Sequence, residues 1–220
     1  IWFSGIGEDN LIRIPVTGPL RSMDISALRK AIKKDRASGY LPAGIIAATG
    51  GTSSGSCDNI SEVANVAKEE NLYMHVDAAW AGSAMICSEY RYLWEGVEKA
   101  DSIVFNPHKW LGAQFDCSVQ FLKDPSIQKK TLSISPEYLK TKGVDGITNL
   151  SEYTIQLGRR FRALKIWFLI RSEGLSGLKK MIRNHVNWTS DLHLKIKDLK
   201  NIEIITDPIL SLFTFRFLNQ

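Results

Sequence analysis

The chain has 220 residues, and its 44% hydrophobic and 23% charged content is typical of a globular protein with a packed core. The net charge of +5 is spread over many segments without a compact basic block, which disfavours a nucleic-acid-binding protein. No apolar run reaches membrane-spanning length and no signal-peptide pattern is present, so we expect neither membrane insertion nor secretion. The three cysteines lack CxxC spacing, which predicts reduced thiols in a cytoplasmic protein and no metal site.

The first part of the chain alternates strand and helix patterns. Residues 10–16 alternate apolar and polar side chains and predict a strand. Asp24 or Ser26 is expected to cap a helix over residues 25–38, and a second strand is expected over residues 43–48.

The same alternation continues to about residue 122. The expected elements are a Gly-, Ser- and Thr-rich loop over 49–56, a helix over 60–71 started by Asp58, a strand over 72–77, a helix over 90–100, and strands over 103–105 and 117–122. A loop of this composition after a strand binds phosphate in some proteins and is a plain turn in others. The recurring order predicts an α/β fold with a mostly parallel sheet and helices on both faces.

The rest of the chain begins with a long polar loop over residues 131–151, a length typical of a functional lid or a disordered segment. The later expected elements are a helix over 158–173, a break at Gly174, a helix over 176–199, and strands over 202–206 and 210–217. Cations crowd the start of the first helix, the unfavourable end for them, so they need carboxylates or a partner surface; they are Arg159, Arg160 and Arg162. His185 and His193 lack companions at metal-ligand spacing and are expected to be ordinary surface or core residues.

The strand over residues 103–105 ends at the turn formed by Asn106 and Pro107, which places His108 and Lys109 at the carboxyl end of the sheet. Ligands bind at that end in open α/β sheets. Apolar neighbours there would favour the neutral amine of Lys109, which can form a Schiff base with an aldehyde such as pyridoxal phosphate. A single Lys after a loop is more often an ordinary surface residue.

A second strand end upstream carries Asp77, followed by the small residues Ala78 and Ala79. Pyridoxal chemistry needs a carboxylate against the pyridine nitrogen, and small side chains leave room for a flat ring. Asp77 could otherwise cap the next helix. A strand ending in Asp, followed about thirty residues later by a strand ending in Asn-Pro-His-Lys, favours a pyridoxal phosphate site.

The segments HVDAAWAGSA, NPHKWLGAQFDCS and LGRRFRALKIW resemble those of the pyridoxal-phosphate-dependent group II decarboxylases, of the fold type I superfamily. Trp110 and the following FDCS are most similar to the aromatic-L-amino-acid decarboxylase branch. The resemblance covers nearly all 220 residues and matches the middle of the family's chain. It implies a fragment that lacks an upstream phosphate-binding loop, an upstream ring-stacking His and most of the small C-terminal domain.

The resemblance also assigns domains and roles. Residues 1–173 correspond to the C-terminal part of the large cofactor-binding domain, and residues 174–220 to the beginning of a small α+β domain. The resemblance implies that Lys109 forms the Schiff base and that Asp77 pairs with the ring nitrogen. It also implies that Thr52 faces the cofactor, Asn106 donates to the phosphate and Ala79 packs on the ring. On the substrate side it implies that His108 orients the carboxylate or moves protons, and that Tyr138 is the catalytic Tyr of a mobile loop. We leave His75 out of the site as a possible core residue.

The resemblance implies decarboxylation of an aromatic L-amino acid by a homodimer. A group II enzyme for glutamate, histidine or a diamino acid stays open, and so does an aldehyde-forming aromatic member. An inactive fragment that only binds a partner subunit is the alternative outside the enzyme class.

Overall fold

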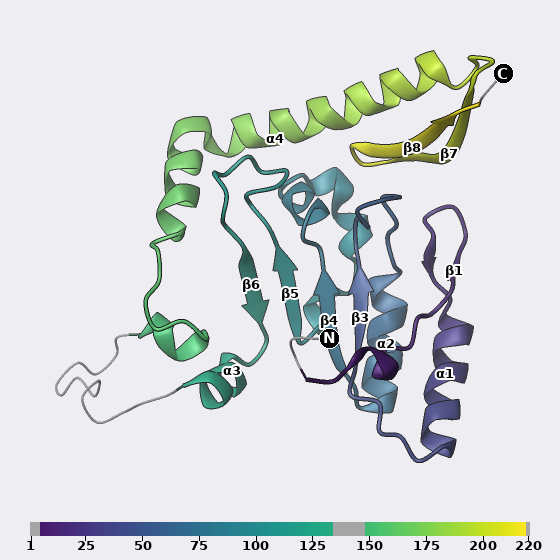
Figure 1. The fold of residues 1–220 in the computed structure, drawn as a ribbon. Coiled ribbons are helices and arrows are strands. Elements are labelled where there is room, and N and C mark those ends of the chain that lie inside the picture. Colours follow the sequence, from purple (N-terminus) through teal and green to yellow (C-terminus); the bar gives the residue numbers. More distant parts are fainter. Residues whose placement is uncertain (1–4, 134–147, 219–220) are drawn as a thin grey trace.

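The computed structural model describes residues 5–133 and 148–218 of the chain. A four-stranded sheet occupies its centre, in the order β3 (Gly44–Ala48), β4 (Tyr73–Asp77), β5 (Ser102–Phe105) and β6 (Val119–Leu122). Strands β3, β4 and β5 are parallel, and β6 pairs antiparallel with β5 at the edge (Figure 1). The predicted mostly parallel sheet is therefore confirmed.

Two helices cover one face of this sheet. Helix α1 (Ile25–Ala37) begins at Asp24, whose side chain accepts a hydrogen bond from Ala27 N, and α2 (Ile60–Glu70) begins at Asn59, whose side chain accepts one from Glu62 N. Amide donors at the first turn of a helix have no partner within the helix, and such side chains supply one. The main buried cluster lies between these helices and the alternate strand residues Ile45, Ala47, Met74 and Val76.

Asp58 does not cap α2 as expected, because its carboxylate is engaged elsewhere. Its two oxygens accept hydrogen bonds from Ala48 N at 2.7 Å and Met23 N at 2.6 Å. Burial raises the pKa of Asp58, and these two backbone donors oppose that shift. Asp58 thus joins the end of β3 to the hairpin of β1 (Val16–Thr17) and β2 (Ser22–Met23).

The opposite face of the sheet is open within the described residues. Ile46 on β3 and Tyr73 on β4 are about half exposed, at 57% and 47%. His75 and Asp77 lie on the same face as Tyr73, because successive side chains of a strand point to opposite faces. Among the described residues, α1 and α2 cover the other face, so helices on both faces are not seen in this part of the chain.

Two expected elements differ in the structure. The strand expected over residues 10–16 is absent except for Val16, the first residue of β1. Pro15, which has no N–H to donate, lies in this stretch, and its carbonyl accepts from Asp24 N. The helix expected over 90–100 is two 3₁₀ turns, Ser88–Trp94 and Val97–Lys99, because Gly96 between them has φ of 90° and approaches the backbone of Ser61 closely.

The last third of the chain forms a kinked helix and a hairpin. Helix α4 (Ala163–Ile196) starts five residues later than expected, and Gly174 interrupts it with φ of 66° where a break is predicted. Figure 1 shows its second half passing above the carboxyl ends of β3, β4 and β5. Strands β7 (Ile202–Ile209) and β8 (Leu212–Phe217) pair antiparallel beside it, close to the two strands predicted over 202–206 and 210–217.

The remaining elements are short. They are η1 (Glu8–Asn10), η2 (Ala81–Ile86), α3 (Pro125–Leu132) and η6 (Leu150–Tyr153), and the last two shorten the predicted 131–151 loop at its ends. Within the described residues, no helix is both long and apolar enough to cross a bilayer.

Candidate active site

Backbone hydrogen bonds bring the ends of β3, β4 and β5 together. Thr49 N donates to Asp77 O at 2.9 Å, and Ala78 N donates to Val104 O at 3.0 Å. One step further along, Asn106 N donates to Ala79 O at 2.8 Å. The parallel ladder thus continues past the strands and fixes the three loops that carry the predicted site residues.

Asp77 is the last residue of β4 and presents its carboxylate on the open face of the sheet. Its Oδ1 accepts a hydrogen bond from Ala79 N at 3.0 Å, which orients the carboxylate. Within the described residues no hydrogen bond engages Oδ2, so this oxygen is available to a ligand donor. A carboxylate oxygen without a partner can accept a hydrogen bond from a ring N–H.

His75 lies two residues before Asp77 on the same face, and its Nδ1 is 2.6 Å from Ser102 Oγ on β5. Burial lowers the pKa of His75, and the negative charge of Asp77 opposes that shift. His75 is half-buried and its Nδ1 has a hydrogen-bond partner, as the sequence allowed for a residue outside the site.

Lys109 lies in the turn after β5, where its N–H donates to Asn106 O at 2.9 Å. Its side chain is exposed, so the apolar surroundings expected for it are not found among the described residues. In the part of the chain that the structure describes, no carboxylate forms an ion pair with its ammonium group. The amine is therefore accessible to a ligand at the carboxyl end of the sheet.

His108 is held by the segment that leads into β6. Its Nδ1 lies 2.6 Å from Cys117 O and 2.9 Å from Cys117 N, and its ring meets the edge of Phe115 at 4.9 Å between centroids. Because the backbone of Cys117 engages Nδ1, Nε2 is the ring nitrogen left for substrate or cofactor.

The remaining predicted residues sit in the same three loops. Ser118 Oγ donates to Asn106 Oδ1 at 2.6 Å, which leaves the amide N–H groups of Asn106 to donate to another acceptor. Thr52 is exposed in the turn after β3, and Ala79 follows Asp77 with a half-buried methyl group. Tyr138 lies outside the described residues.

This donor set fits pyridoxal phosphate. The exposed amine of Lys109 suits the cofactor aldehyde, and the free carboxylate oxygen of Asp77 suits the pyridine nitrogen. The amide of Asn106 can donate to the phosphate, and Thr52 offers an exposed hydroxyl in the neighbouring loop. Ala79 adds no bulk where a flat ring would lie. Among the described residues, no group of three His, Cys, Asp or Glu could hold a metal ion.

Sequence reasoning missed the support behind these residues. The indole rings of Trp80 and Trp110 stack at 4.9 Å between centroids and 11° between planes, which joins the loops after β4 and β5. Arg162, expected to need a carboxylate, donates to Asp116 Oδ2 from Nη2 at 2.8 Å and from Nε at 3.1 Å. The Arg162 guanidinium lowers the pKa of Asp116 to about 2. The sequence showed the cations but not which acid they would meet.

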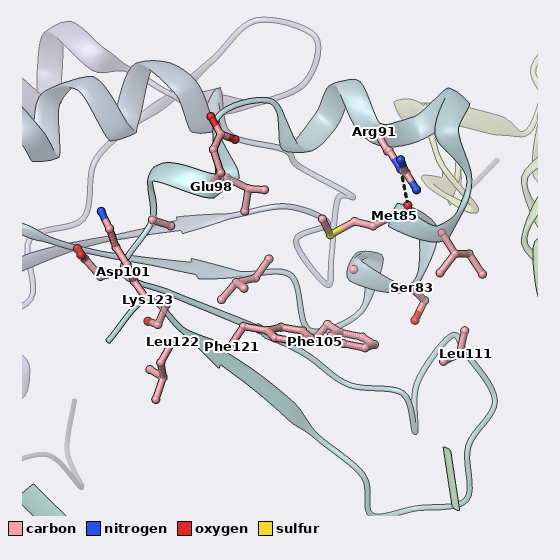
Figure 2. Close-up of a pocket in the computed structure, with 16 residues that line it drawn as sticks. Ser83, Met85, Arg91, Glu98, Asp101, Phe105, Leu111, Phe121, Leu122 and Lys123 are labelled. Atoms are coloured by element: carbon pink, nitrogen blue, oxygen red, sulfur yellow. Dashed lines mark hydrogen bonds between the residues drawn. The ribbon is translucent and has the colours of Figure 1, made fainter. Parts of the chain in front are cut away.

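A cavity of about 540 Å³ lies elsewhere and contains none of the predicted site residues. It is bounded by the β5 and β6 side chains Phe105 and Phe121, whose rings lie parallel, and by Met85, whose carbonyl accepts from Arg91 (Figure 2). Ile103 and Phe121 are strand partners on the face opposite Asp77, so this cavity and the predicted site are on different faces of the sheet.

The fold is that of the pyridoxal-phosphate-dependent proteins of the fold type I class. The model of the pyridoxal-dependent decarboxylase conserved domain matches residues 3–218. The chain is 43% identical over 213 residues to the aromatic-L-amino-acid decarboxylase of Mus musculus, covering 96% of this chain and 44% of that protein. The chain belongs to the pyridoxal-dependent decarboxylase family.

Solved structures agree with this assignment. Oryza sativa TDC, solved with PLP and tryptamine, superposes with a TM-score of 0.93 at 34% identity, over 98% of this chain and 45% of that one. Rhodiola rosea 4-hydroxyphenylacetaldehyde synthase gives 0.89 at 31% identity, over 99% and 44%. The chain spans less than half the length of these relatives. The predicted family, fold class and cofactor are confirmed.

Proposed function

We propose that the protein decarboxylates an aromatic L-amino acid to its amine and carbon dioxide, and that this chain supplies the strand ends that hold pyridoxal phosphate. The observation that carries the proposal is the placement of Asp77 and Lys109 at the carboxyl ends of the neighbouring parallel strands β4 and β5. The names of the mouse and rice relatives support an aromatic substrate.

Each residue has a distinct task. When bound, pyridoxal phosphate supplies an electron sink that lowers the barrier to losing the substrate's α-carboxylate. Lys109 would hold the cofactor through its ε-amine and yield to the substrate amine, and Asp77 Oδ2 would keep a proton on the ring nitrogen. Asn106 would donate its amide N–H to the phosphate, and Thr52 would face the cofactor with its hydroxyl.

Two further residues would act on the substrate. His108, fixed at Nδ1 by Cys117, would orient the α-carboxylate or move a proton through Nε2. Tyr138 would give a proton to Cα after carbon dioxide leaves, and this assignment rests on the sequence alone. Ala79 would pack against the cofactor ring.

The substrate class is tested by measuring amine and carbon dioxide release from Tyr, Dopa, Trp, Phe, His and Glu. We expect turnover with one or more of the aromatic substrates and none with His or Glu. Release from Glu or His alone would instead place the protein with another group II decarboxylase.

An aldehyde-forming reaction is the second candidate, because an aldehyde synthase is among the structural relatives. Tyr138 favours the decarboxylase, since its phenol can protonate Cα before oxygen reacts there. Tyr138→Phe should still release carbon dioxide while diverting product from amine to aldehyde, ammonia and peroxide. Amine and peroxide measured side by side decide this, and an unchanged amine yield would make Tyr138 an ordinary loop residue.

We also propose that the protein is a cytoplasmic homodimer. The first half of α4 exposes a set of large apolar side chains suited to a subunit interface, namely Leu164, Trp167, Phe168 and Ile170. All three cysteines are free thiols, which suits a reducing compartment. The division into domains at residues 173 and 174 stays a prediction.

A further inference from the structure

The loop that carries Lys109 is tied to a helix far away in sequence. Trp110, the residue after Lys109, donates from its indole Nε1 to Nδ1 of His185 at 3.0 Å. Only 8% of Trp110 is exposed, so this indole N–H has little access to water. Leaving a buried donor without an acceptor destabilises the folded protein. His185 supplies the acceptor for the indole N–H of Trp110.

The contact is held from both sides. His185 lies in the second half of α4, one turn after Ile182, which is fully buried in the same apolar cluster as Trp110. On the other side, Trp110 stacks on Trp80, which belongs to the loop that follows Asp77. Gly50, in the loop after β3, lies so close to Trp80 that a Cβ there would be 2.7 Å from its ring.

The indole pair therefore touches all three loops that carry the predicted site, and His185 is its hydrogen-bond partner in α4. A His that accepts at Nδ1 is neutral and carries its proton on Nε2. We infer that His185 is a positioning residue that holds Trp110, and through it Lys109, in the place where the amine meets the cofactor. This inference rests on the proposed function, because it assigns Lys109 to the cofactor.

Four variants separate the hydrogen bond from simple packing, each made in the protein carrying its complete reading frame. His185→Phe keeps a ring of similar size and removes the acceptor, whereas His185→Asn places an amide oxygen near the position of Nδ1. Trp110→Phe removes the donor from the other side. His193→Phe is the matched control, because His193 is on the same helix half but contacts Phe213 and Asp207.

Binding of pyridoxal 5′-phosphate to the cofactor-free protein is the readout, followed by imine absorbance and by borohydride trapping on Lys109. We expect His185→Phe to raise the Kd about tenfold and slow adduct formation, since one well-aligned hydrogen bond to a buried donor is of that order. His185→Asn should recover to within about threefold of wild type, as expected if an acceptor is what matters. His193→Phe should leave the Kd unchanged.

The double variant His185→Phe/Trp110→Phe should bind no more weakly than the weaker single variant, because both changes remove the same bond. A wild-type Kd in His185→Phe, or an equal loss in His185→Asn, overturns the inference. If His185→Phe does not fold, the Kd of Trp110→Phe is the test. A wild-type Kd in that variant also overturns the inference.

Separate measurements test the proposed function and the role of His185. If the wild-type protein forms no adduct on Lys109, the proposed function is wrong. The hydrogen bond itself is then judged in the cofactor-free protein from the indole N–H Raman band that Trp110→Phe removes. That band should shift to a weaker-bonded position in His185→Phe and stay in place in His193→Phe, and an unshifted band in His185→Phe contradicts the assignment.

Discussion

The two faces of the four-stranded sheet are built from alternate residues of the same strands, yet one is buried under helices and the other is exposed. On one face, Ile45 and Met74 are buried beneath α1 and α2. On the other, Ile46 is more than half exposed, and Asp77 ends β4 with a carboxylate that faces outward. One-residue alternation thus assigns core packing to one side of the sheet and the proposed site residue Asp77 to the other.

The largest effect should come from Lys109→Ala, which removes the amine at the end of β5 without touching the buried face. Turnover should fall by more than about 10,000-fold, as when other covalent catalytic groups are removed. The thermal unfolding midpoint without cofactor should stay at the wild-type value. A variant that keeps a borohydride-reducible adduct would show that the amine belongs to another residue.

Asp77→Ala should have the next largest effect. The variant should retain some cofactor while kcat falls about 100- to 1,000-fold, the usual loss when one group that stabilises developing charge is removed. Cofactor absorbance and steady-state kinetics measure the two effects separately. A near-normal kcat would show that Asp77 has no role in the mechanism. The open face of the sheet would then carry no catalytic carboxylate.

A matched pair on β3 compares the two faces directly. Ile45→Ala should lower the free energy of unfolding by about 2–5 kcal/mol, because it opens a cavity under the helices. Ile46→Ala, one residue away, should cost less than about 0.5 kcal/mol in the 220-residue chain, because Ile46 is exposed there. Urea denaturation of both variants is the measurement. Equal costs would mean that the open face is packed as tightly as the helical one.

The smallest effect should be on how the stability of the fold depends on acidic pH, through the ion pair of Asp116 and Arg162. The pKa of Asp116 is lowered to about 2 by Arg162, so its contribution to stability is complete above the ordinary Asp pKa of about 4. That contribution should disappear as the pH falls from about 4 through 2, because the unfolded chain binds the proton first. Asp116→Asn should flatten this part of the curve measured by denaturation at each pH, and an unchanged slope would contradict the ion pair.

Local patterns were enough to predict the strands and helices around the site. Short apolar runs identified β4 and β5, a capping residue identified the start of α1, and the Asn-Pro turn placed Lys109 at a strand end. The strand over residues 10–16 failed because alternation there is not matched by a pairing partner along its length. The helix over 90–100 failed because Gly96 approaches another backbone segment, which periodicity does not reveal.

The supporting contacts of the site could not be predicted, because they join distant parts of the chain. Trp110 and His185 are 75 residues apart, and Asp116 and Arg162 are 46 apart. The sequence shows which side chains need partners but not which partner the tertiary fold will bring. For Lys109 it predicted the position at the strand end, but the apolar surroundings it predicted are not found among the described residues, since exposure of a loop depends on what packs over it.

Lys109, in the turn after β5, is the residue that we propose holds the cofactor. Borohydride reduction of the pyridoxal 5′-phosphate complex, followed by proteolysis and mass spectrometry, tests it most directly. We expect one pyridoxyl-modified peptide, with the added mass on Lys109. Modification of another lysine, with Lys109 recovered unmodified, would contradict it.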